Sequence, residues 1–207
     1  MRAYRSNLAH IILGEGCGGK IRFLHQLNPR TSSSSQVRDL GVQQRMRVAV
    51  LLSGRAQFSV LYGGAMVRWT YEVYRRLQPQ VEIKVFGFPT DPETRYALPH
   101  ETSDWHRACI AISKVPALRR WEDDLWLRAL VSRLQQFDVI HIHNRPQWAP
   151  ILRRLGYKGV IVPHLHNDHL GHWTPETLDR LAPALDSLVV CSTYIGDRFF
   201  MQGHLFR

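Results

Sequence analysis

From residue 46 onward the chain alternates short apolar runs with longer amphipathic segments, and this alternation limits the fold more than any other feature. Residues 47–53 and 159–165 are apolar along nearly their whole length, which is typical of strands buried on both faces. Residues 118–136 instead carry apolar side chains three and four positions apart, as an amphipathic helix does. Strands that alternate with helices in this way predict an α/β fold with a Rossmann-like, doubly wound parallel sheet.

The same periodicity predicts the individual elements. The expected strands are 47–53, 81–88, 109–113, 137–143, 159–165 and 188–192. One expected helix begins after Gly63-Gly64. Four further helices are expected at 118–136, 146–155, 175–185 and 193–202.

Residues 1–45 have a different composition, which is rich in arginine, poor in acidic residues and interrupted by four serines at 32–35. Gly14, Gly16 and Gly19 spell G-x-G-x-x-G, but the second strand and the acidic residue of a dinucleotide site do not follow at the required spacing. We interpret 1–45 as a flexible leader or a mis-called start, with a mitochondrial transit peptide as the alternative. The folded domain is then expected to span 46–207.

Charge, cysteines and hydropathy exclude several classes of protein. The net charge is +10, but the domain lacks the dense basic runs of a nucleic-acid-binding protein. Three cysteines lie far apart without a C-x-x-C motif, as in a reduced cytosolic protein. No apolar run approaches the ~18 residues of a membrane span. We therefore expect a cytoplasmic protein, or one bound peripherally to the inner membrane, with no nucleic-acid partner.

Chemically distinctive residues follow the expected strands at their carboxyl ends, where open parallel sheets bind ligands. Two glycines without Cβ atoms after the first strand would let a phosphate approach the amide groups of a helix N-terminus, although a turn could equally require them. The candidate site residues are Gly63 and Gly64, His143 and Asn144, and His166, Asn167 and Asp168.

Histidines concentrate on two neighbouring strands. We expect His141 and His143 to point to opposite faces or to differ in depth, with His143 as the better site candidate. His164, His166, Asp168 and His169 spell H-x-H-x-D-H, which resembles the zinc motif of metallo-β-lactamase-like hydrolases. The upstream alternation of strands and helices differs from the β-sandwich of that family, and only two histidines follow downstream. We therefore expect no metal, and keep the zinc hydrolase as an alternative.

A second resemblance covers nearly all of residues 46–207. The chain contains, in order, M-R-V-A-V-L-L, Y-G-G-A, F-D-V-I-H-I-H-N-R-P, K-G-V-I-V-P-H-L-H-N-D-H-L and L-V-V-C-S-T-Y-I-G-D-R-F. This series resembles the N-terminal, acceptor-side domain of family 4 glycosyltransferases of the GT-B fold.

The resemblance implies transfer of a sugar from a nucleotide-sugar donor to a glycan or lipid-linked acceptor, as in polysaccharide biosynthesis, without a cofactor. It places Gly63 and Gly64 at the donor diphosphate and the catalytic His166 at the reacting sugar. His143, Asn144, Asn167 and Asp168 then face the acceptor or the sugar. The family's C-terminal donor domain is expected to be absent from this chain and encoded separately, so that the chain is inactive alone. An acceptor-binding module without catalysis is a further alternative.

Overall fold

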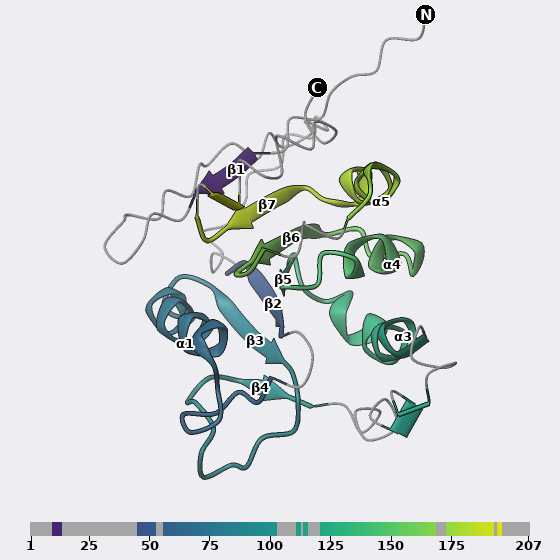
Figure 1. Cartoon of the computed structure of the whole chain (residues 1–207). Helices are drawn as coiled ribbons and strands as arrows, with labels where there is room; N and C mark the ends of the chain where they lie inside the picture. Colours follow the sequence, from purple (N-terminus) through teal and green to yellow (C-terminus); the bar gives the residue numbers. More distant parts are fainter. Residues whose placement is uncertain are drawn as a thin grey trace, which may run out of the picture.

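The protein folds around a single parallel sheet. The computed structural model describes residues 10–13, 45–52, 56–102, 111–112, 114–115, 121–168, 173–192 and 194–195. Seven strands pair in the order β1-β7-β6-β5-β2-β3-β4, and all the pairings are parallel (Figure 1). The strands are β1 (His10–Leu13), β2 (Arg47–Leu51), β3 (Glu82–Phe86), β4 (His100–Glu101), β5 (Val139–His143), β6 (Val160–Leu165) and β7 (Ser187–Val190).

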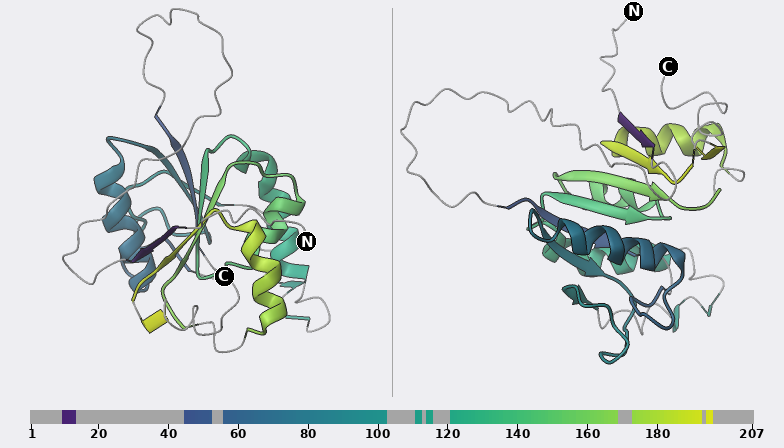
Figure 2. Two further views of the ribbon diagram at one scale, coloured as in Figure 1. Left: turned by 90° about the horizontal axis from the view of Figure 1, so that it is seen from above. Right: turned by 90° about the vertical axis from the view of Figure 1, so that its left-hand side faces the viewer.

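Helices cover both faces of this sheet (Figure 2). One face carries α1 (Ala65–Leu77), and the other carries α3 (Glu122–Leu134), α4 (Trp148–Arg154) and α5 (Pro175–Leu181), which continues into the short 3-10 helix η3 (Ala182–Ala184). This arrangement confirms the predicted Rossmann-like α/β fold, which is consistent with one half of a GT-B enzyme. Among the described residues, no helix combines the length and the apolar character needed to cross a membrane.

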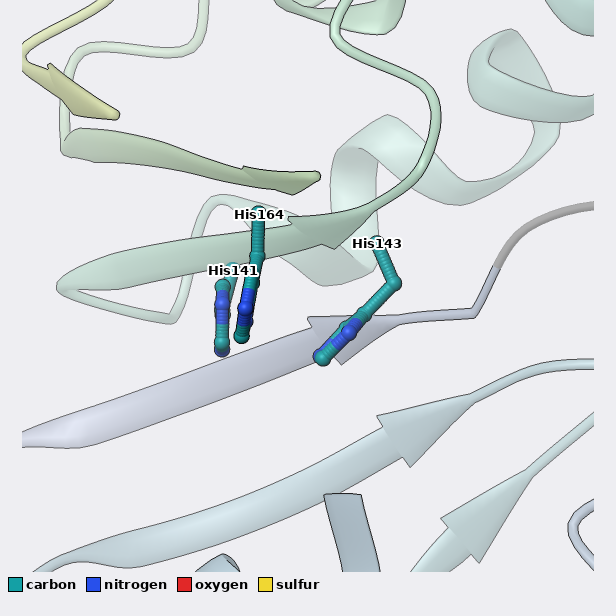
Figure 3. A group of neighbouring side chains, drawn as sticks. All are labelled: His141, His143 and His164. Carbon is teal, nitrogen blue, oxygen red and sulfur yellow. The ribbon is translucent and has the colours of Figure 1, made fainter. Parts of the chain in front are cut away.

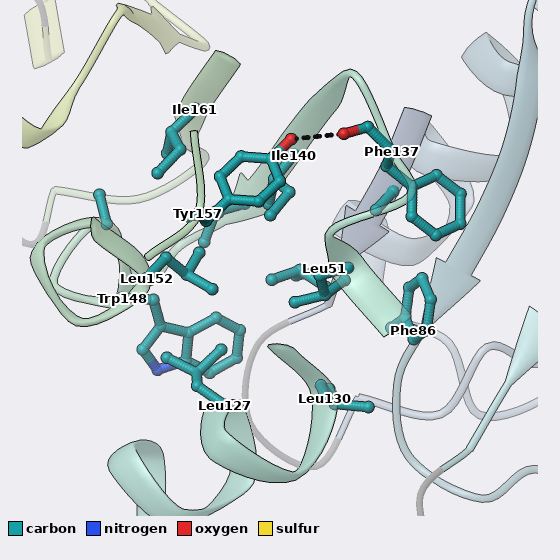
Figure 4. Packing of buried hydrophobic residues seen from close by; sticks show 14 of the residues in the cluster. Leu51, Phe86, Leu127, Leu130, Phe137, Ile140, Trp148, Leu152, Tyr157 and Ile161 are labelled. Atoms are coloured by element: carbon teal, nitrogen blue, oxygen red, sulfur yellow. Dashed lines mark hydrogen bonds between the residues drawn. The ribbon is translucent and has the colours of Figure 1, made fainter. Parts of the chain in front are cut away.

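Side chains that alternate along the central strands fill two separate cores. On β2, Ala49 and Leu51 face α3 and α4, whereas Val48 and Val50 face α1. The core beneath α3 and α4 is the larger and is shown in Figure 4. Its labelled members are Leu51, Phe86, Leu127, Leu130, Phe137, Ile140, Trp148, Leu152, Tyr157 and Ile161.

Two edges of the sheet differ from the sequence-based expectation. Residues 111–112 are helical, so the strand expected at 109–113 is wrong at these positions, and the other three residues lie outside the described part of the chain. The strand beside β3 is instead β4, whose polar His100 and Glu101 carry no apolar run. Ion pairs from Lys84 (2.7 Å) and Arg133 to Glu101 tie β4 to β3 and α3. At the opposite edge, β1 pairs with β7, which the sequence analysis did not predict.

We predict that replacing Tyr157 with phenylalanine destabilises the fold by about 1–3 kcal/mol. Tyr157 is buried, and its hydroxyl donates to the backbone oxygen of Phe137 at 3.0 Å (Figure 4). The variant leaves that carbonyl without its donor. Urea unfolding of Tyr157→Phe should show this loss, whereas Tyr62→Phe, at a side chain that is 69% exposed, should change stability by less than about 0.5 kcal/mol. Equal stability of the two variants would contradict the prediction.

Candidate active site

Four histidines from β5 and β6 gather on the face of the sheet that α1 covers. His141 and His143 belong to β5, His164 to β6, and His166 follows β6 directly. The expectation that His141 and His143 point to opposite faces is wrong, because side chains two positions apart on a strand share a face. The alternative, a difference in depth, is small, since the two residues are 7% and 0% exposed. Their ring centroids lie 4.4 Å apart, and both rings are buried. Figure 3 shows these two rings and His164 projecting to the same side of the strands.

The parallel register explains why the four rings meet. His143 pairs with His164 across β5 and β6, so residues two positions before and after them fall into line on the same face. The His164 and His166 rings stack with centroids 4.0 Å apart, and those of His143 and His166 lie 5.0 Å apart. A sequence pattern of H-x-H on each of two paired strands therefore becomes one compact cluster.

Trp69 of α1 covers this cluster. Its indole ring meets all four imidazoles edge-on, and its centroid lies 4.5 Å from that of His164 and 5.4 Å from that of His166. The sequence analysis did not single out Trp69, because an aromatic residue in the helix expected after Gly63-Gly64 indicates burial but does not show which side chains the indole meets.

Hydrogen bonds connect the cluster to α1. The Tyr74 hydroxyl bonds Nδ1 of His141, and the Thr70 hydroxyl lies 3.5 Å from Nε2 of His143. The Nδ1 atom of His143 is 2.7 Å from Nε2 of His166. His143 is fully buried, and its ring is hydrogen-bonded to that of the partly exposed His166.

Burial keeps the imidazoles neutral at physiological pH. It lowers the pKa of His141 to about 3 and that of His166 to about 4, and a small like-charge effect of His166 acts on His141 as well. Burial, reinforced by the neighbouring histidines, also lowers the pKa values of His143 and His164. Within the described residues, no carboxylate contributes to these shifts, so protonation would place a positive charge in an apolar interior without a counter-ion.

By their spacing, three rings of the cluster could hold a metal ion. Ring nitrogens of His141, His143 and His164 lie within 4.8 Å of one another (Figure 3). Tetrahedral zinc with Zn–N bonds of about 2.0–2.1 Å requires neighbouring nitrogens about 3.3–3.4 Å apart. Nδ1 of His143 is already held by His166, so this ring could offer only Nε2 to an ion, and three neutral imidazoles would give the ion no anionic ligand. The expectation that the protein uses no metal stays a prediction.

Asn144 joins the ends of β5 and β6. Its backbone adopts a positive φ of 55°, and its amide N–H donates to the oxygen of His164 at 2.9 Å. Its side-chain oxygen accepts from the amide of His166 at 2.7 Å, and its side-chain nitrogen lies 3.6 Å from the sulfur of Met66 on α1. Asparagine tolerates the left-handed conformation better than most residues. Asn144 therefore fixes where His166 leaves the sheet.

The two glycines play different parts. A Cβ on Gly63 would lie 2.3 Å from the backbone oxygen of Ser59, so this glycine is required by the tight turn before α1. Gly64 is the N-cap of α1, and a Cβ there would meet no atom within 4 Å. Neither a capping side chain nor an acidic residue occupies the first turn. The amide groups of that turn therefore receive no side-chain cap, and a helix N-terminus has a favourable potential for an anion.

The predicted residues thus meet at one edge of the sheet. Met66, two positions after Gly64, contacts Asn144, and Asn144 holds the amide of His166. The next two residues, Asn167 and Asp168, are exposed. His169 lies outside the described residues, as do residues 196–202 of the last expected helix, although residues 194–195 are helical.

Comparison with known proteins agrees with this geometry. A family model described as Glycosyltransferase Family 4 matches residues 62–201, which is more than half of the chain. The chain therefore belongs to glycosyltransferase family 4, as the resemblance of its motifs predicted. A search of curated proteins finds no match.

We predict that the fold loses stability as the pH falls from 7 to 5. Each histidine of the cluster has a folded pKa below its unfolded pKa of about 6.5. Below about pH 6.5 the unfolded state therefore binds more protons than the folded state, and the free energy of unfolding falls as the pH falls. Each neutral histidine of the cluster then costs about 1.4 kcal/mol per pH unit below 6.5. Urea unfolding at several pH values measures the slope, and His141→Gln should make it shallower. A stability that stays constant from pH 7 to 5, or a slope unaltered in the variant, would contradict this.

Proposed function

We propose that this chain forms the acceptor-side domain of a glycosyltransferase that moves a sugar from a nucleotide-sugar donor to a glycan or a lipid-linked acceptor. The observation that carries the proposal is the contact between the first turn of α1 and the end of β5, made by Met66 and Asn144. It sets an open helix N-terminus and a partly exposed, neutral histidine side by side at the carboxyl edge of a parallel sheet.

Gly64 is proposed to receive the donor diphosphate. Open space at its Cβ position lets phosphate oxygens approach the amides of the first turn of α1, and the helix dipole favours their negative charge. Gly63 contributes indirectly, because only a glycine permits the turn that presents Gly64. No metal is needed for this part of the binding.

His166 is proposed to contact the reacting sugar, with Asn167 and Asp168 beside it. The His166 ring is partly exposed, and the two residues after it project polar side chains into solvent. Amide and carboxylate groups are suitable partners for sugar hydroxyls. We assign His143 and Asn144 to supporting roles, because the first is buried behind His166 and the second bonds the backbone of His166.

Catalysis by this arrangement would depend on a second domain. Clamping the donor and holding an acceptor hydroxyl near the anomeric carbon supplies up to ~7–11 kcal/mol of the barrier reduction. Stabilisation of the departing diphosphate adds to this effect. The described residues offer one wall of such a site, and a C-terminal donor domain would supply the other. The parallel sheet and the family match support this function over the zinc hydrolase.

The diphosphate site is tested by Gly64→Asp. Aspartate is a favourable N-cap, so we expect the variant to be as stable as the wild type or a few tenths of a kcal/mol more stable. Its carboxylate should nevertheless repel pyrophosphate from the first turn of α1. In amide NMR spectra, millimolar pyrophosphate should shift residues 64–67 of the wild-type chain and leave the variant unchanged. Gly64→Ala is the matched control, since its Cβ meets open space. Equal shifts in wild type and Gly64→Asp would contradict the assignment.

Transfer itself is expected to require both domains. The 207-residue chain alone should release no nucleoside diphosphate from a nucleotide sugar in the presence of an acceptor. Addition of a C-terminal donor domain should restore release, and His166→Ala should then reduce it by at least about a hundredfold, the scale of losing one preorganised polar contact. Unfolding curves of His166→Ala check that the variant is folded. Robust turnover by the chain alone would disprove the two-domain requirement.

A further inference from the structure

We infer that His143 is a positioning residue that holds His166 as its Nε2–H tautomer and thereby makes Nδ1 of His166 an acceptor for a sugar hydroxyl. The contact with sugar rests on the function proposed above, whereas the tautomer follows from the hydrogen bonds inside the protein alone. The hydrogen bonds run from Thr70 on α1 through His143 to His166.

Thr70 determines which atom donates in each of these successive hydrogen bonds. Its side chain is fully buried, and its hydroxyl donates to the backbone oxygen of Met66 at 2.9 Å. A hydroxyl has only one proton to donate. Toward Nε2 of His143, at 3.5 Å, the same oxygen must therefore accept, which favours a proton on Nε2 of His143.

His143 passes this direction of donation on to His166. Burial lowers the pKa of His143, so its ring is neutral and carries one N–H proton. With that proton on Nε2, Nδ1 carries a lone pair and can only accept a hydrogen bond. Nδ1 of His143 and Nε2 of His166 are 2.7 Å apart. Two lone pairs at this separation would repel each other. The proton between the rings therefore belongs to His166, whose Nε2 donates to His143.

The backbone of His166 is held at the same time. Its amide donates to the Asn144 side chain at 2.7 Å, and its carbonyl accepts from the Cys191 thiol at 3.2 Å. With a pKa of about 4, its ring has a single proton at neutral pH, and that proton faces inward. Nδ1 makes no hydrogen bond with any described residue and is not among the buried nitrogens without a partner. It is consequently the acceptor that His166 offers to a ligand.

If the hydrogen bonds ran in the opposite direction, the arrangement would be less favourable and would be distinguishable by NMR. It would set the bare Nε2 of His143 against the Thr70 oxygen, whose proton is already used, and would leave His166 with an outward Nδ1–H. Such a ring would donate to a ligand oxygen instead of accepting from a hydroxyl. The two arrangements differ in which nitrogen of His166 carries hydrogen, and ¹⁵N chemical shifts of imidazoles report that directly.

The experiment uses the full 207-residue chain labelled with ¹⁵N-histidine at pH 7.5, where His166 is neutral. The signals of His166 are assigned by their loss in His166→Asn. We expect wild-type His166 to show a protonated Nε2 and an unprotonated Nδ1. His143→Asn should preserve this pattern, because the Asn oxygen takes the place of Nδ1 as acceptor. His143→Leu removes the acceptor and should yield averaged shifts of the two tautomers.

Tyr74→Phe is the matched control. It deletes a buried hydrogen bond of the same cluster, on His141, without touching the bond between His143 and His166. We expect it to leave the shifts of His166 unchanged. A protonated Nδ1 on His166 in the wild type would overturn the inference even if every variant failed to fold. An unaltered pattern in folded His143→Leu would overturn the positioning role of His143.

A separate experiment tests the proposed contact of His166 with the sugar. Addition of millimolar UDP-glucose or GDP-mannose should move the Nδ1 resonance of His166 and leave the tautomer unchanged. If the nucleotide sugars shift residues 64–67 but not Nδ1 of His166, the sugar contact is wrong while the assignment of the tautomer stands. Failure of the function and failure of the inference are thus distinguished.

Discussion

The parallel pairing of β5 with β6 decides where each chemically distinctive side chain lies. The register that opposes His143 to His164 puts both strands' histidines on the face beneath α1. A shift of one residue in this pairing would still leave His141 and His143 on their face, but it would turn His164 and His166 to the opposite face. Ile161 on β6 prevents such a shift, because it must stay buried in the core beneath α3 and α4. The hydrophobic pattern thus fixes the polar cluster.

Helix α1 turns that cluster into a site. Its Trp69 excludes water from the rings, and its Thr70 and Tyr74 supply hydroxyls to His143 and His141. The same helix begins after its N-cap Gly64, where a Cβ would meet open space and no side chain caps the helix. One element therefore provides both the buried support for the histidines and the amide groups at the edge. The proposed positioning of the histidines and the proposed anion binding both depend on the placement of this single helix.

The same packing keeps the histidines electrically neutral. Buried imidazoles without a carboxylate partner remain uncharged, which makes each ring a donor at one nitrogen and an acceptor at the other. A chain of such rings transmits hydrogen-bond direction over several ångströms from Thr70 to the surface. A charged cluster could not do this, since both nitrogens of an imidazolium are donors.

The sequence by itself determined the fold class and predicted the place of the candidate site. Apolar runs alternating with amphipathic segments predict a parallel α/β sheet, and polar residues after its strands predict a site at the carboxyl edge. Such patterns are local, so a single sequence is enough to read them. It failed at β4, whose two polar residues carry no apolar signal, and at β1, whose strand lies in a segment read as a leader.

Only the tertiary structure decided which residues act together. The sequence treats Gly63 and Gly64 alike, whereas contact with Ser59 makes one a requirement of the turn and leaves the other open. It names His143 as a candidate contact, whereas the structure buries this residue behind His166, which is why we propose a supporting role for it. Asn144, Thr70 and Trp69 gain their roles from residues distant in the chain. Strand register and helix packing set those contacts, and neither follows from the local pattern of residues.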